Sequence, residues 1–279
     1  MKHTKLTSAA IALALAAVLS TSAHAQVAGY NIGDLLIGFE QQNGSGGVTA
    51  NDYVVDLGSA STFIGATSPL TFNLSTTNLT SAFGSAWATN TGTSLVQWGV
   101  IGGSDLNNPL TLGSVTLAKN TLFYTQAEQT LGTHSTAPAT LSNSGQKNVN
   151  GNIQQFAQDY QGTNPGVSGS VIASNDPNGY SALGNPSLTG FGSGKNIEQP
   201  SSGTATGPTN SELDLYQLNN TTTTPGAKAN LLGNFTLSSA GVLTYTAAAA
   251  VPEPSSYILA ALAAATFVVL RRRKAISAQ

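Results

Sequence analysis

Few residues in this sequence are of the types that usually carry enzymatic chemistry. The 279 residues contain no cysteine and three histidines, and His134 is the only histidine after residue 25. No Gly-x-Ser-x-Gly nucleophile elbow stands between an expected strand and an expected helix. We therefore expect no Ser-His-Asp site, and we expect His134 to be an exposed loop residue. One histidine without cysteines also disfavours a zinc site.

Acidic residues could form the carboxylate pair that glycoside hydrolysis requires. The candidates are Glu40, Asp52, Asp56, Glu128, Asp159, Glu212 and Asp214. Four acids flank expected strands, namely Asp34, Glu40, Asp52 and Asp56. We expect these four to be solvated strand ends that resist edge pairing. A secreted hydrolase is therefore the weakest of the functional alternatives.

A calcium loop and an aromatic sugar platform are the remaining candidate sites. The segment from Ser174 to Gly179 resembles a calcium loop, but Ser174 replaces the first aspartate and Asn185 stands where the bidentate glutamate belongs. A β-turn is the expected structure there. Trp87 and Trp98 lie in apolar patterns typical of a core, which leaves Tyr180 as the better candidate for an exposed ring. The sequence thus predicts no catalytic residue, no metal and no cofactor.

Short apolar runs separated by glycine-rich and polar turns predict most of the elements. Expected strands cover residues 34–40, 52–57, 95–101, 115–117, 122–125, 212–218, 231–237 and 242–246. Helical spacing predicts one short helix over 76–90, capped by Thr76 or Thr77, and a second containing Ile153 and Tyr160. Residues 161–210 are rich in Gly, Asn, Pro and Ser and are expected to form irregular loops. This pattern predicts a mainly β, sandwich-like antiparallel domain with two short helices.

Charge is distributed unevenly along the chain. Residues 26–250 contain four lysines, no arginine and 11 acidic residues, for a net charge of −7, whereas the whole chain has −2. Nucleic acid is therefore not an expected partner. Without cysteines, the core must be held by burial of apolar surface alone.

The first 25 residues have the pattern of a secretory signal peptide. Lys2 and Lys5 precede an apolar run from Ala9 to Leu19, and Ala23 and Ala25 form a small-x-small cleavage site. Cleavage after Ala25 would leave residues 26–250 as the exported domain.

The last segment, residues 251–279, has three parts. Pro252, Glu253 and Pro254 predict an extended, accessible motif, because proline cannot donate the backbone hydrogen bonds of helix or sheet. The uncharged run 257–270 predicts a helix of about 21 Å, shorter than the roughly 30 Å of a bilayer core. Four cations follow it, Arg271, Arg272, Arg273 and Lys274, and they favour a cytoplasmic C-terminus.

This three-part tail resembles the PEP-CTERM sorting signal of Gram-negative bacteria. The resemblance implies recognition by a membrane-embedded exosortase that cuts near the motif, and an association with exopolysaccharide and biofilm. The runs Gly33–Phe39, Tyr53–Gly58 and Leu213–Tyr216 are similar to those of uncharacterised Verrucomicrobia-like PEP-CTERM proteins. That second resemblance brings no catalytic residue with it.

These observations predict an exported protein of the cell surface or extracellular matrix with a structural or adhesive role. Before processing, the tail would hold the chain transiently in the inner membrane, with an exosortase-type protease and then exopolysaccharide as partners. A carbohydrate-binding module is the alternative of a different class. No enzymatic activity is expected.

Overall fold

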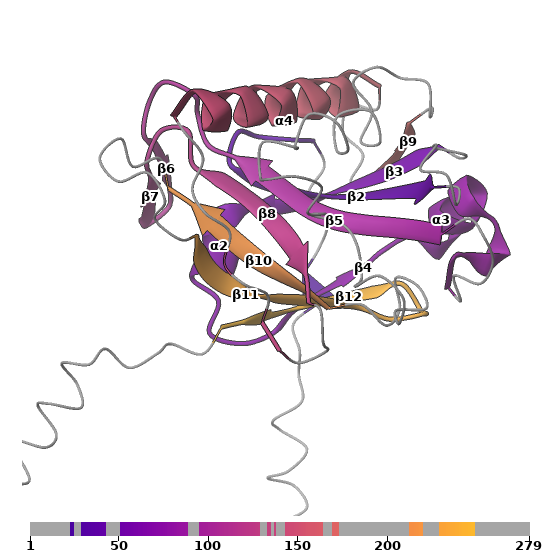
Figure 1. The fold of residues 1–279 in the computed structure, drawn as a ribbon. Helices are drawn as coiled ribbons and strands as arrows, with labels where there is room; N and C mark the ends of the chain where they lie inside the picture. Colours follow the sequence, from indigo (N-terminus) through magenta and orange to yellow (C-terminus); the bar gives the residue numbers. More distant parts are fainter. Residues whose placement is uncertain are drawn as a thin grey trace, which may run out of the picture. The chain divides into compact units, whose positions relative to one another are not determined.

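The computed structural model describes residues 23–24, 29–42, 51–88, 95–128, 133–134, 137, 143–163, 169–172, 212–219 and 229–248 (Figure 1). The sorting tail 251–279, most of the export signal and residues 173–210 lie outside the described residues. The chain divides into two compact units, Met1–Ala247 and Ala248–Gln279. No helix in the described part of the chain is both long and apolar enough to cross a membrane.

The first unit is built on one ten-stranded sheet. Its strands are β1 (Ala23–His24), β2 (Asp34–Gln42), β3 (Asp52–Ser59), β4 (Leu70–Asn73), β5 (Leu95–Gly103), β8 (Leu122–Ala127), β9 (Gly169–Ile172), β10 (Glu212–Leu218), β11 (Asn230–Leu237) and β12 (Val242–Ala247). Their order is β1-β4-β12-β11-β10-β8-β5-β2-β3-β9, and all pairs are antiparallel except β1 with β4. A separate hairpin joins β6 (Leu110–Leu112) to β7 (Val115–Leu117). The predicted mainly β, sandwich-like antiparallel class is confirmed.

The helices extend the sequence prediction. They are α2 (Ala60–Ile64), α3 (Thr76–Phe83), a 3-10 turn η1 (Ser85–Ala88) and α4 (Asn143–Thr163). The predicted caps of α3, Thr76 and Thr77, are wrong by one or two residues, because the Ser75 hydroxyl accepts the Asn78 N–H at 3.2 Å. Helix α4 has 21 residues and begins well before the apolar spacing that predicted it.

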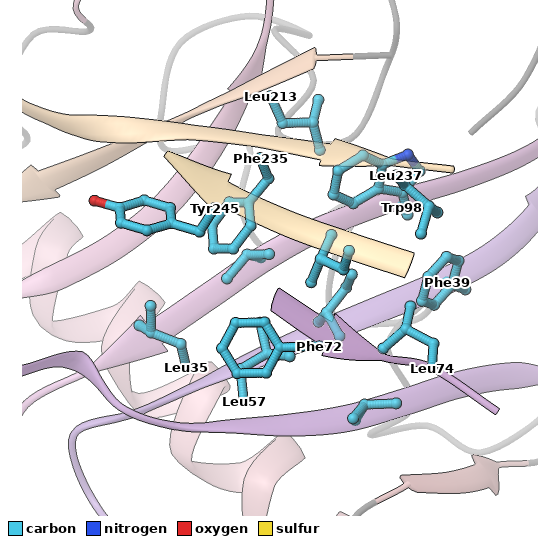
Figure 2. Packing of buried hydrophobic residues seen from close by; sticks show 14 of the residues in the cluster. Leu35, Phe39, Leu57, Phe72, Leu74, Trp98, Leu213, Phe235, Leu237 and Tyr245 are labelled. Carbon is cyan, nitrogen blue, oxygen red and sulfur yellow. The ribbon is translucent and has the colours of Figure 1, made fainter. Parts of the chain in front are cut away.

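The sheet curls so that its two halves face each other across a shared core. Side chains of β11 and β12 and side chains of β2 and β3 point into the same interior (Figure 2). Phe39, Trp98, Phe235 and Tyr245 are fully buried there. Because both halves belong to one continuous sheet, the two layers of the sandwich are joined through β10 and β8.

Helix α2 lies against both halves of the curled sheet, in contact with β3 and β12. The Phe63 ring stacks on the Phe72 ring, with 5.8 Å between the ring centroids, and contacts the Tyr245 ring edge-on, with 5.2 Å between the centroids. The Tyr245 hydroxyl donates to the Leu232 carbonyl at 2.7 Å, which satisfies its polar end. This aromatic cluster fixes the inner core without any disulfide.

A second core lies on the outer face of the sheet, beneath α4 (Figure 1). Ile153, Phe156 and Tyr160 of the helix are packed with Tyr124 and Tyr216 of the sheet. The helix comes so close to β5 that a Cβ added at Gly103 would overlap the Asn150 amide. Glycine at this position therefore permits the packing.

Amide side chains fix the position of α4. Gln146 Nε2 donates to the carbonyls of Asn120 and Leu218 at 2.8 and 3.0 Å. Asn150 Nδ2 donates to the Ser104 carbonyl at 2.8 Å and to Asn120 Oδ1 at 3.2 Å. Asn120 has a left-handed φ of 60°, a conformation that asparagine tolerates better than most residues. The helix thereby satisfies buried backbone carbonyls at the ends of β5 and β10 and beside β8.

The prediction that Asp34, Glu40, Asp52 and Asp56 are solvated strand ends is wrong. Their exposed fractions lie between 0 and 5%. Strands β2 and β3 lie inside the sheet order, between β5 and β9, so they have no open edge to protect. Residues that alternate with the inner-core residues point to the outer face, and that face is covered as well.

Replacement of Asn150 with alanine tests the amide contacts of α4. We expect Asn150→Ala to lower the free energy of unfolding by about 1–3 kcal/mol, because Asn120 Oδ1 loses a donor and the Ser104 carbonyl keeps only the longer hydrogen bond from Gln154 Nε2. Asn148→Ala is the matched control, since Asn148 is exposed on the same helix and should change stability by less than about 0.5 kcal/mol. Urea unfolding monitored by circular dichroism measures both variants. Equal effects would contradict the role assigned to Asn150.

Burial raises the pKa of Asp56 to about 7, despite a hydrogen bond from the Gly58 N–H, and the nearby Asp34 adds to the shift. Because the folded state binds the proton more tightly, stability is lost as pH rises from about 4 through about 7. Asp56→Asn should remove this dependence and stabilise the fold at pH 8.5 by on the order of 1–3 kcal/mol. Urea unfolding at pH 5 and pH 8.5 measures it. Asp105→Asn, at a half-buried acid whose pKa is lowered by the Asn107 and Asn108 N–H groups, is the control, and an unchanged pH dependence in Asp56→Asn would refute the assignment.

Candidate metal-binding site

Three potential metal ligands, Glu128, His134 and the distant Asp214, come together at one end of β8 and β10. His134 Nδ1 lies 2.9 Å from Asp214 Oδ1 and 3.6 Å from Glu128 Oε1. One ligand atom from each of the three side chains fits within a span of 4.8 Å. The group offers one imidazole nitrogen and two carboxylate oxygens.

Sheet pairing positions the two carboxylates. Leu213 of β10 pairs with Ala127 of β8, and the Glu128 N–H donates to the Glu212 carbonyl at 3.2 Å as the ladder continues. Glu128 therefore lies opposite Glu212. Asp214 is two residues from Glu212, so the side chains of Glu128 and Asp214 project from the same face of the sheet. Backbone hydrogen bonds between adjacent strands therefore fix the separation of the acids.

Neighbouring polar groups orient the side chains further. Glu128 Oε2 accepts the Thr133 N–H at 3.1 Å, which ties the residue preceding His134 to the end of β8. Glu212 Oε1 accepts from Asn234 Nδ2 of β11 at 2.9 Å. These contacts direct Glu128 toward His134 and hold Glu212 toward β11.

The electrostatics of the site are asymmetric. The Asp214 and Glu128 side chains are buried, while the His134 side chain is 54% exposed. The hydrogen bond to Asp214 is the main cause that raises the pKa of His134, and the charges of Asp214, Glu128 and Glu212 act in the same direction. The prediction of an exposed His134 is correct, but the residue is anchored to buried carboxylates through one ring nitrogen.

A histidine held by a carboxylate can bind a metal or transfer a proton. Sequence reasoning considered all three residues separately and did not join them, because His134 and Asp214 are 80 positions apart. Only the pairing of β8 with β10 brings them together. The alternation in the run from Glu212 to Leu218 indicated which face Asp214 occupies, but not which residues it meets.

The other predicted candidates are distributed differently. Trp87 and Trp98 are buried, at 4 and 0% exposure, as predicted. Every tyrosine and phenylalanine among the described residues is also buried, and Ile32 is the one large exposed apolar residue in that part of the chain. Tyr180 and the segment 174–185 lie outside the described residues, and the side chain of Asp159 is not described.

The protonation of His134 provides a test of the pairing with Asp214. We expect an imidazole pKa above the ordinary 6.5, lowered in Asp214→Asn because the anionic acceptor is lost. The shift of the His134 Cε1–H resonance with pH measures the pKa, and the resonance is assigned by its absence in His134→Gln. Asp105→Asn, in the loop that follows β5, should leave the pKa of His134 unchanged. An equal pKa in wild type and Asp214→Asn would contradict the pairing.

Comparison with known proteins identifies a sorting motif near the end of the sequence. Residues 250–274 match the family model of the PEP-CTERM protein-sorting motif. No curated protein and no solved structure matches the chain. The match includes Pro252, Glu253 and Pro254 and all four cations from Arg271 to Lys274, as the sequence predicted. The chain therefore carries a PEP-CTERM sorting motif at residues 250–274, which supports export and processing by an exosortase.

Proposed function

We propose that the chain is a structural or adhesive component of the cell surface or extracellular matrix of a Gram-negative bacterium, and has no enzymatic activity. The sorting motif at residues 250–274 carries the proposal. An exosortase-type membrane protease removes the tail, and the β domain then acts in exopolysaccharide or biofilm. The tail spends only the time before cleavage in the inner membrane.

The composition of the exported region supports this role. Charged residues make up 8% of the chain, while glycine alone supplies 30 residues and hydroxyl and amide side chains are abundant. Such a surface binds neighbouring polymers through many weak hydrogen bonds and few ionic contacts. A net charge of −7 for residues 26–250 opposes nonspecific self-association.

A carbohydrate-binding module remains the alternative of a different class. Protein modules that bind sugars by stacking need exposed aromatic rings, and the described residues expose none. Tyr180 is the ring that the alternative relies on. Loss of polysaccharide binding in Tyr180→Ala, with cell-surface location retained, would favour the module over a purely structural role.

The sorting proposal predicts the ends of the mature protein. Mass spectrometry of the chain from membrane, cell-surface and medium fractions should find a species that begins at Gln26 and ends close to Pro252. Glu253→Ala should leave the full tail on the chain and retain it in the membrane fraction, because the motif presented to the protease is altered. Asp105→Ala is the control and should be processed normally. A surface protein that still ends at Gln279 would contradict processing.

A further inference from the structure

We propose that Glu128, His134 and Asp214 bind one divalent first-row transition-metal ion of the zinc type. This site is independent of the sorting signal and goes beyond the proposed function. It uses a nitrogen and two oxygens from three segments of the chain.

The separations fit a shared ion. Ligand atoms lie about 2.0–2.2 Å from Zn²⁺, so two atoms that bind the same ion are at most about 4.4 Å apart. The His134 Nδ1 separations of 2.9 Å to Asp214 and 3.6 Å to Glu128 are within this limit. All three atoms fit within 4.8 Å, so small side-chain rotations bring them onto one ion.

Preorganisation of the carboxylates favours binding. Asp214 lies on β10, and Glu128 directly follows the paired strand β8 and donates its N–H to the Glu212 carbonyl. The Thr133 N–H holds one oxygen of Glu128 while the other lies toward His134. The ion therefore does not have to order these two ligands. The exposed imidazole provides the solvent side of the site, from which an ion and its remaining water ligands can enter.

The donor types select the class of ion. Calcium and magnesium prefer shells made entirely of oxygen, whereas imidazole nitrogen suits zinc, cobalt, nickel and copper. Two carboxylates and a neutral imidazole also balance the charge of one dication. The ion would join the segment that contains His134 to β8 and β10, and so stabilise the folded state by mass action.

The test uses the full chain in mild detergent, stripped with a chelator. Titration with Co²⁺, followed by visible absorption, and calorimetric titration with Zn²⁺ should give one saturable site per chain. His134→Gln and Glu128→Gln should each weaken the affinity by at least tenfold. Because His134 is exposed, His134→Gln is expected to fold, and circular dichroism confirms folding of each variant.

Two controls separate this site from other metal ligands in the chain. His3→Gln/His24→Gln removes the other two histidines and should retain the one-to-one site. Asp105→Asn should bind as the wild type does. Absence of saturable Zn²⁺ binding, or equal affinity in wild type and His134→Gln, would overturn the proposal. Ca²⁺ or Mg²⁺ binding as tightly as Zn²⁺ would overturn it as well, since the imidazole would then not be a ligand.

Discussion

The central strands bury side chains on both faces of the sheet. Leu35, Ile37 and Phe39 of β2 point into the inner core, while Leu36 points to the outer core beneath α4. The same alternation holds on β10, with Leu213 and Leu215 inside and Tyr216 and Leu218 outside. Burial of both faces provides apolar area that a chain without disulfides needs. It also forces the acids on these strands into buried positions.

Buried acids are the energetic consequence of this arrangement. Asp56 avoids the cost of a buried charge by protonation near neutral pH, because desolvation raises its pKa by more than the hydrogen bond from the Gly58 N–H lowers it. Asp214 offsets the cost of burial through a hydrogen bond with His134. The two responses have different chemical uses. A protonated acid in an apolar setting tunes stability with pH, whereas a carboxyl group hydrogen-bonded to an imidazole can help to bind a cation.

Local sequence patterns predicted β2, β3, β5, β7, β8, β10, β11 and β12 but missed β1, β4, β6 and β9. Strand β9 lies within the range 161–210 that was expected to form irregular loops, and it is held there by pairing with β3. The near-continuous apolar run 95–101 predicted a buried strand, and β5 lies in the middle of the sheet. The acids of β2 and β3 were wrongly predicted to be solvated, because the local sequence does not show that β3 pairs with β9. The start of α4 was missed because Gln146 and Asn150 occupy its buried face, where a periodicity argument looks for apolar residues.

The candidate site was not predicted from the sequence for the same reason, since His134 and Asp214 come together only through the pairing of β8 with β10. Each residue is unremarkable in its own segment. The sorting tail, by contrast, could be identified fully from sequence, because its three parts are contiguous. Recognition by a protease requires an accessible linear motif, and such motifs do not depend on the fold.

The two predicted cleavages differ in their effect on the strands of the sheet. Strand β12 ends at Ala247, and the sorting motif begins at residue 250, so the predicted cleavage near Pro252 would leave β12 whole. The predicted cleavage after Ala25 would remove β1, which pairs with Thr71 and Phe72 of β4. Strand β4 would then become the edge of the sheet, and at four residues it is short enough to resist pairing with other chains. The buried apolar residues of both cores extend from Tyr30 to Tyr245. Both predicted cleavages would therefore fall outside the segment that supplies the core, and residues 26–250 would keep all of these buried apolar side chains.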